Sequence, residues 1–102
     1  MSTYTSKALF RGAATTTTTT TLYTVPSATT TVVTDIVVTN TAGSSGTFTM
    51  SLDDVVIAEN VTVAANDSTV IQIKQVLAAA DTIKGGASAT TINFHISGVE
   101  IA

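Results

Sequence analysis

Hydrophobic and polar residues alternate along much of the chain, and an alternation of period two is typical of a β-strand that is half buried in a sheet. The clearest case is residues 46–52, where Phe48, Met50 and Leu52 are separated by threonine and serine. Residues 15–41 are dominated by threonine and valine, whose branched side chains favour strands over helices. Pro26 cannot donate a ladder hydrogen bond, so it divides this stretch in two.

The second part of that stretch is predicted to be a long strand over residues 29–41. Strict alternation places Val32, Ile36 and Val38 on one face, and Val33 and Val37 on the other. Valine on both faces indicates a strand that is buried on both sides or that faces a partner.

Residues typical of turns separate the remaining strands. Asp53-Asp54 and Gly85-Gly86 are two such signals, and an alternation that changes phase after Gly98 predicts a bulge there. Residues 75–80 are expected to form a loop or one helical turn, since an alanine-rich segment this short is not a stable helix alone. Turns are expected at residues 25–28, 42–46, 53–54, 66–68 and 85–86. Strands are expected from within the threonine run to residue 24, and at 29–41, 46–52, 55–58, 61–63, 70–73, 82–84 and 92–101.

About eight short strands at this spacing predict an all-β fold, namely a single antiparallel β-sandwich that is either jelly-roll-like or immunoglobulin-like. Residues 15–102 are expected to form the sandwich domain. Residues 1–14 show no clear period, and they are expected to be either a disordered tail or an extended N-terminal arm that docks on a neighbouring subunit.

The low charge content is the most informative feature of the composition, because it bears on what the surface contacts. Only 11% of the residues are charged, whereas an ordinary soluble domain has about 25%. Apolar residues make up 44% of the chain, and its formal net charge is −3. A surface this poor in charge is expected to adhere to other protein, so we expect much of it to be covered in the working state.

The same composition argues against several other partners. The four basic residues are scattered, which does not resemble a nucleic-acid footprint or a polybasic membrane patch. We therefore expect no nucleic-acid partner. No stretch has the length of apolar sequence that spanning requires, so we expect no membrane partner. The first residues lack a basic region followed by a long apolar run, so we expect no signal peptide. There are no cysteines, so neither a disulfide nor a thiolate metal site is possible.

Candidate interface residues lie in the expected arm and in the run of seven threonines that follows it. The threonine run has no side-chain pattern to fix its register, and it is expected to begin an edge strand. The residues expected to contact other subunits are Tyr4, Leu9, Phe10 and Arg11 in the arm, with Thr15, Thr17, Thr19 and Thr21 in the edge strand.

The candidates for chemistry are few. His95 is the single histidine and is expected on an outer face, opposite Phe94 and Ile96, rather than as a ligand or base. Asp53-Asp54 lacks the spacing of a calcium loop, so a solvated turn is preferred and a bound cation is left open. We expect no catalytic residues, no cofactor, no metal and no enzymatic activity.

The order of several segments resembles a family of small virion proteins of tailed bacteriophages. The matching pieces are TLYTVPSATTTVV at residues 21–33, Asn40-Thr41, LAAADTI at residues 77–83 and NFHISGVEI at residues 93–101. The seven threonines and the short strand at residues 55–58 depart from that pattern. The resemblance implies a β-sandwich structural subunit of the virion, and it leaves open whether the subunit belongs to the head or the tail.

The preferred hypothesis is therefore a capsid decoration or cement protein that stabilises the head lattice. Its expected partners are copies of itself and the major capsid protein or tail proteins, in a virion assembled in the host cytoplasm. One alternative is a tail, neck or fibre-base component. A second alternative is a carbohydrate-binding or adhesion sandwich, which the absence of tryptophan disfavours.

Overall fold

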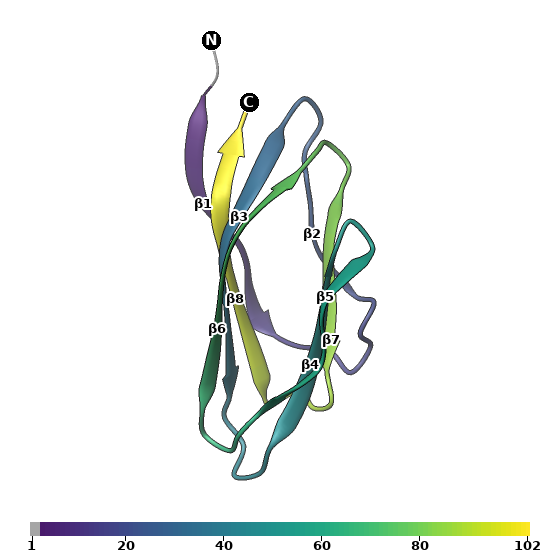
Figure 1. Cartoon of the computed structure of the whole chain (residues 1–102), viewed down its shortest axis with the longest axis vertical. Helices are drawn as coiled ribbons and strands as arrows, with labels where there is room; N and C mark the ends of the chain where they lie inside the picture. The colour runs from purple at the N-terminus through teal and green to yellow at the C-terminus, as the bar shows by residue number, and fades with distance from the viewer. Residues whose placement is uncertain (1–2) are drawn as a thin grey trace.

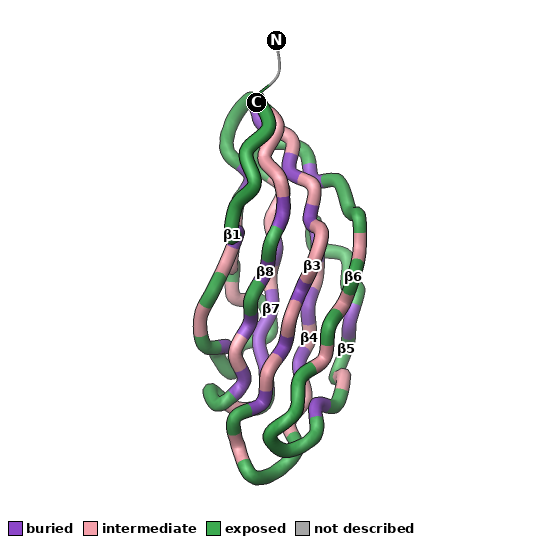
Figure 2. The backbone as a smooth tube through the Cα atoms, turned by 90° about the vertical axis from the view of Figure 1, so that its left-hand side faces the viewer, coloured by how far each residue is buried: buried purple, intermediate pink, exposed green. Residues whose placement is uncertain are grey.

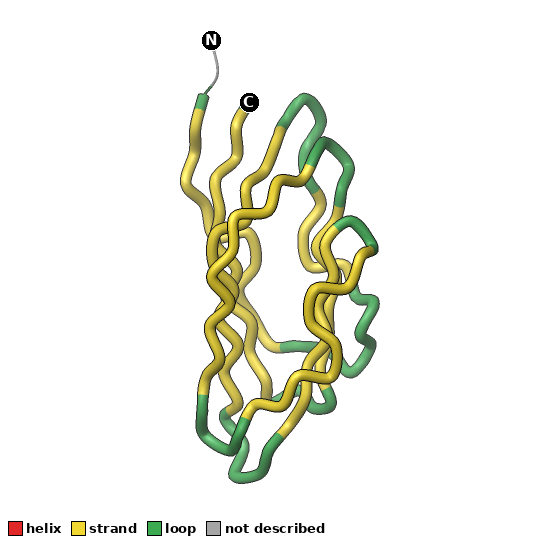
Figure 3. Tube along the Cα trace, in the orientation of Figure 1, coloured by secondary structure: helices red, strands yellow, loops and turns green. Residues whose placement is uncertain are grey.

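A computed structural model describes residues 3–102, and these residues form two four-stranded antiparallel sheets packed face to face. Figure 1 shows the two layers running along the long axis of a body of 49 × 21 × 18 Å. The expected all-β sandwich is confirmed, and Figure 3 shows strands joined only by loops and turns. No helix in the described part of the chain is long and apolar enough to cross a membrane. The strands are β1 (Tyr4–Ala13), β2 (Thr21–Thr24), β3 (Thr30–Asn40), β4 (Gly46–Leu52), β5 (Val55–Val63), β6 (Ser68–Leu77), β7 (Thr82–Ala87) and β8 (Ile92–Ile101).

The strand order identifies the sandwich as a jelly roll rather than an immunoglobulin-like fold. One sheet has the order β1-β8-β3-β6 and the other has the order β2-β7-β4-β5. The chain pairs from its middle outward: β4 with β5, β3 with β6, β2 with β7, and β1 with β8. Only the β4–β5 connection stays within one sheet, so the molecule is a long hairpin rolled up on itself.

The turn joining β4 and β5 is set by local sequence. Asp53 and Asp54 both have positive φ, 52° and 60°, as the two central residues of a tight hairpin turn require. The predicted turn at residues 25–28 also lies between strands, and those at 42–46 and 66–68 do so except for their last residues, Gly46 and Ser68, which begin β4 and β6. Asn66 likewise has a positive φ of 54°. Aspartate and asparagine tolerate this backbone region better than most residues, so their positions are informative.

The core lies between the sheets and is built from the alternation that the sequence displays. Phe48 and Met50 on β4 and Phe94 on β8 are almost completely buried, and the rings of Phe48 and Phe94 meet edge to face with centroids 6.1 Å apart. Figure 2 shows the alternation along β8 and β3, while the edge strands β1 and β6 are largely exposed. Asn40 is also buried, and its amide donates to Ser44 O and Val63 O at 2.8 and 3.1 Å.

A row of register shifts crosses the β1-β8-β3-β6 sheet beside Ser97. Relative to β8, the extra residue is Leu9 in β1 and Thr34 in β3, and β6 adds Ile73 and Lys74 opposite Thr34. The bulge predicted at Gly98 is therefore wrong in its strand: β8 runs through without a shift, and its neighbours carry the additional residues.

The shift in β3 also corrects the two faces expected from strict alternation. Val33 is buried before the bulge, whereas Ile36 and Val38 are buried after it, because one extra residue exchanges the faces. Val32 and Val37 are only partly buried, on the outer face.

Three further expectations differ from the structure. Residues 55–58 and 61–63 are not two strands but parts of one, β5, in which Glu59 and Asn60 form a register shift opposite Thr49. Residues 75–77 extend β6 rather than forming a loop or a helical turn. Gly85 and Gly86 lie in β7 and not in a turn. Glycine is required there because an added Cβ atom would lie 2.8 Å from Thr49 O at the first position and 2.3 Å from Thr17 O at the second.

We predict that Gly98→Ala destabilises the protein. The added Cβ would lie 2.4 Å from Val32 O and 2.8 Å from Leu9 Cδ1, so the row of register shifts would have to open. The expected loss is about 1–3 kcal/mol in the free energy of unfolding, measured by chemical denaturation. Gly43→Ala is the matched control, since nothing lies within 4 Å of its added Cβ; equal stabilities for the two variants would contradict the prediction.

Candidate assembly surface

The N-terminal segment expected to be an arm is an edge strand in this structure. Residues 4–13 pair with β8 along their whole length, so the described part of the segment belongs to the sandwich rather than lying outside it. The bulge at Leu9 directs two successive apolar side chains inward: Leu9 is buried in the core, and Phe10 packs against it. Tyr4 and Arg11 point to solvent, and Tyr4 is 70% exposed. The four candidates therefore divide into two that hold β1 in place and two that face outward.

The threonine run is a loop rather than an edge strand. Residues 15–20 leave the ladder, and β2 begins only at Thr21, as the short edge of the second sheet. The loop returns to β7 at both ends, where Thr15 O and Thr20 O accept hydrogen bonds from Ala87 N and Gly85 N at 2.8 and 2.9 Å. Within the loop, the Thr20 hydroxyl donates to Thr17 O at 2.8 Å. Thr15, Thr17, Thr19 and Thr21 are all exposed.

A polar cluster ties the two sheets together near one end of the molecule. The Tyr23 hydroxyl on β2 donates to the Glu100 carboxylate on β8, and it shares a 2.8 Å hydrogen bond with the Thr31 hydroxyl on β3. The Lys7 ammonium on β1 lies 3.4 Å from the same carboxylate. Desolvation, followed by the neighbouring Glu100 carboxylate, raises the pKa of Tyr23 to about 12. The cluster therefore holds β1 and β2 against the rest of the fold.

The side of the sandwich formed by β5 and β6, across from β1 and β2, carries most of the exposed large hydrophobic residues, and the sequence analysis did not predict it. Six large hydrophobic residues of the described chain are exposed, and five of them lie on β5 and β6. Each of these strands is the last of its sheet, and both edges lie on the same side of the sandwich. The five residues are Val55, Val56, Ile57, Val70 and Val76.

A groove of about 240 Å³ runs between these two edges. Val55 and Ile57 line it from β5, and Val76 lines it from β6, while Asp53 lies at its rim. An exposed apolar edge strand is a site where another chain can add, because its outer backbone groups have no neighbour in the sheet. The full lining is Leu52, Asp53, Val55, Ile57, Gln75, Val76 and Leu77. We call the side formed by β5, β6 and this groove the apolar side.

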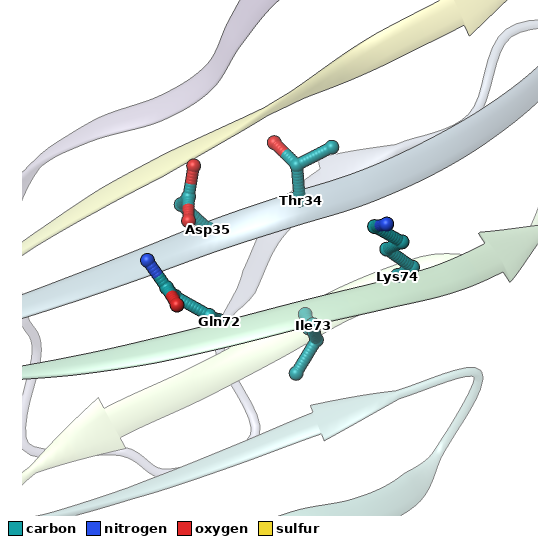
Figure 4. Close-up of a pocket in the computed structure, with 5 residues that line it drawn as sticks. All are labelled: Thr34, Asp35, Gln72, Ile73 and Lys74. Atoms are coloured by element: carbon teal, nitrogen blue, oxygen red, sulfur yellow. The ribbon is translucent and has the colours of Figure 1, made fainter.

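A second hollow of about 560 Å³ lies on the outer face of the β1-β8-β3-β6 sheet, where the register shifts of β3 and β6 meet. Figure 4 shows Thr34 and Asp35 on β3 facing Gln72 and Lys74 on β6. These groups can donate and accept hydrogen bonds. They include no histidine or cysteine and a single carboxylate, so they do not form a nucleophile–base pair.

The other candidates for chemistry lie on the surface. His95 is exposed on the outer face, opposite Arg11 on β1 and Val37 on β3, which is where the sequence placed it. Asp54 pairs with Lys84 at 2.7 Å, and the charge of Asp81 raises the pKa of the exposed Asp53 carboxyl. Residues 3–102 contain no group of three histidine, cysteine or acidic side chains placed to hold a metal ion.

Comparisons with known proteins find similarity of structure only. No protein-family model matches the chain, and no curated protein matches its sequence. The fold is similar to that of a chain of the T13 IBDV viral particle, with a TM-score of 0.58 and 9% identity over 98% of this chain. This chain spans 30% of the length of that IBDV chain, and the likeness establishes a shared fold.

Weaker similarities are found to two further capsid proteins. The coat protein of tobacco streak virus has a TM-score of 0.45 and 13% identity, covering 99% of this chain and 84% of the coat protein. A pentameric capsid protein isolated from metagenomic phage sequences has a TM-score of 0.38 and 14% identity, covering 95% of this chain and 59% of that protein.

We predict that stability falls between pH 10 and pH 12 through Tyr23. The pKa of Tyr23 is raised in the folded state, so its contribution is complete below the unfolded value near 10 and is lost as the pH rises through the folded value of about 12. Ionised Tyr23 would face the Glu100 carboxylate. Urea titrations across this range should show a smaller loss for Tyr23→Phe than for the wild type, and parallel losses would contradict the assignment.

We predict that Leu9→Ala destabilises the fold, whereas Tyr4→Ala does not. Leu9 is 7% exposed and fills the core, so truncation should cost about 2–4 kcal/mol. Tyr4 is 70% exposed, so its replacement should change stability by less than about 0.5 kcal/mol. Chemical denaturation measures both. An independent arm would leave both variants at wild-type stability, and removal of residues 1–14 would then leave the fold intact.

Proposed function

We propose that this chain is a non-enzymatic structural protein of a virus particle, acting as a capsid decoration or cement protein. The observation that carries the proposal is the apolar side, where two edge strands expose five large hydrophobic residues on one side of a jelly roll. In a protein that works alone, such a surface is an aggregation hazard, so its presence indicates a partner that covers it.

The fold and the composition support the proposal. The jelly roll is shared with a chain of the T13 IBDV viral particle. Only 11% of the residues are charged, which suits a subunit whose sides are covered by other protein. The resemblance of residues 21–33 and 93–101 to small tailed-phage virion proteins indicates the same class.

The proposed mechanism is mechanical. Apolar surface removed from water contributes about 25 cal/mol per Å². A small contact is therefore weak in one copy and strong over a lattice, where many copies bind together. The exposed β1 residues Tyr4 and Arg11 and the exposed threonines of residues 15–21 supply a second contact surface. The proposed partners are other copies of this chain and the major capsid protein.

We predict that an antibody raised against the purified chain labels the heads of intact particles of the virus that encodes it. Regular spacing of the label over the head in electron micrographs is the expected result, because a cement protein follows the capsid lattice. Antibody raised against an unrelated protein of the same preparation is the control. Label confined to the tail, neck or fibre base would replace decoration with a tail role, and particles without label would overturn the virion proposal.

A further inference from the structure

We propose that copies of this chain associate head to tail, with β1 of one copy beside β6 of the next and Tyr4 packed against Val76 at the apolar groove. This inference deepens the proposed function, because it rests on the self-association that the function requires and specifies the surfaces that meet. The occupant is a second copy of this chain, and three observations support that choice.

The charges on the two sides of the sandwich are complementary. The side formed by β1, the threonine loop and β2, residues 3–24, carries Lys7 and Arg11 and no carboxylate. The segment from the β4–β5 turn to the end of β6, residues 53–77, carries four carboxylates against one ammonium, that of Lys74. Lys7 pairs with Glu100 and Asp54 pairs with Lys84 inside one copy, so Arg11 and the three other carboxylates carry the difference between the sides. Contact between unlike sides brings these opposite charges together, whereas a two-fold contact of either side with itself opposes like charges. The segment's carboxylates are Asp53, Asp54, Glu59 and Asp67.

The register of the sheet places Tyr4 and the groove at the same height. Tyr4 is opposite Ile101 in β8, and Ile101 is opposite Thr30 in β3. The next residue of β3, Thr31, is opposite Leu77, which lines the groove at the other edge. Tyr4 and Leu77 thus lie one residue apart in height, about 3.3 Å, on the two edges of one sheet. Copies standing side by side at equal height bring the tyrosine to the groove.

The strand directions fit the same arrangement. Three successive antiparallel pairs separate β1 from β6, so these two ten-residue edge strands run in opposite directions. When a second copy is placed beside the first without being turned over, its β1 runs antiparallel to the β6 of its neighbour. Such a contact continues the β1-β8-β3-β6 sheet from one copy to the next. Repeated about an axis along the strands, it closes a ring or extends a row.

The chemistry of the two surfaces is also matched. Tyr4 presents a ring that is 70% exposed, and the groove wall formed by Val55, Ile57 and Val76 is 66%, 40% and 68% exposed. Tyr4, opposite Ile101, and Val76, opposite Val32, both lie on the outer face of the sheet. The tyrosine ring can therefore cover the valine while its hydroxyl stays in solvent.

A mixing experiment tests the inference. Tyr4→Asp blocks one side, and Val76→Asp blocks the other; both positions are exposed in the single copy, so both variants are expected to fold, which circular dichroism checks. In sedimentation velocity, the wild type should form dimers and larger species. Each variant alone should associate about 30-fold or more weakly than the wild type, as expected for the loss of a central contact residue.

The equimolar mixture distinguishes a head-to-tail contact from a two-fold one. Val76→Asp keeps its tyrosine and Tyr4→Asp keeps its groove, so the mixture should form a dimer containing one copy of each and nothing larger. If Val76→Asp alone abolishes association while Tyr4→Asp has no effect, the contact is two-fold and the inference is overturned. A mixture that remains monomeric overturns it as well.

Val56→Asp is the matched control. Val56 is opposite Ser51, on the outer face of β4 and β5, and it is 50% exposed, so it should tolerate a charge without loss of association. Loss of association equal to that of Val76→Asp would place the contact elsewhere and contradict the inference. A wild-type chain that stays monomeric up to millimolar concentration also contradicts it; antibody labelling of particle heads would then still support the proposed function, with single copies bound to the capsid.

Discussion

The four strands of the β1-β8-β3-β6 sheet place different numbers of residues at one level, beside Ser97, and the remainder of the structure depends on how the sheet accommodates this difference. β8 passes through this level without a shift, while β1 and β3 each insert one residue and β6 inserts two opposite Thr34. Since an insertion of one residue exchanges the two faces of a strand, Val33 above the level and Ile36 below it both reach the core. A strand without the insertion would bury only one of them.

The register shifts beside Ser97 also determine which side chains of β8 and β1 reach the surface. Because β8 keeps its phase, Gly98 remains inside and Glu100 follows on the same side, where Tyr23 and Lys7 bind it. Val99 and Ile101 are left on the outer face, partly exposed. The bulge in β1 then allows Leu9 to anchor the strand while Tyr4 stays in solvent. One irregularity thus contributes both to the polar tie between the sheets and to the exposure of Tyr4, which the proposed assembly uses.

Sequence reasoning succeeded where the signal is local and failed where distant segments meet. The alternation at residues 46–52 and the Asp53-Asp54 turn depend on neighbours in sequence, and both were predicted. Gly85 and Gly86 are typical of a turn, but they lie in a strand, where glycine is needed because backbone oxygens of Thr49 and Thr17 come too close for a Cβ atom.

The candidate site shows the same limit. Val55, Val56 and Ile57 are visible in the sequence, yet only the topology shows that β6 and Val76 lie across a groove from them. The outward-facing Tyr4 and Arg11 were predicted to be contact residues, but their place on a strand of the sandwich depends on pairing with β8, which no local pattern reveals.

The nested pairing of the strands also constrains the order in which the chain can fold. β4 and β5 are joined by two residues, whereas Lys7 and Glu100 meet across a separation of 93 residues. Loop closure becomes harder with length, so folding is expected to spread outward from the central hairpin and to finish when β8 enters between β3 and β1. On the ribosome, the N-terminal strand must therefore wait, with Leu9 and Phe10 unprotected, until the last residues of β8 have emerged.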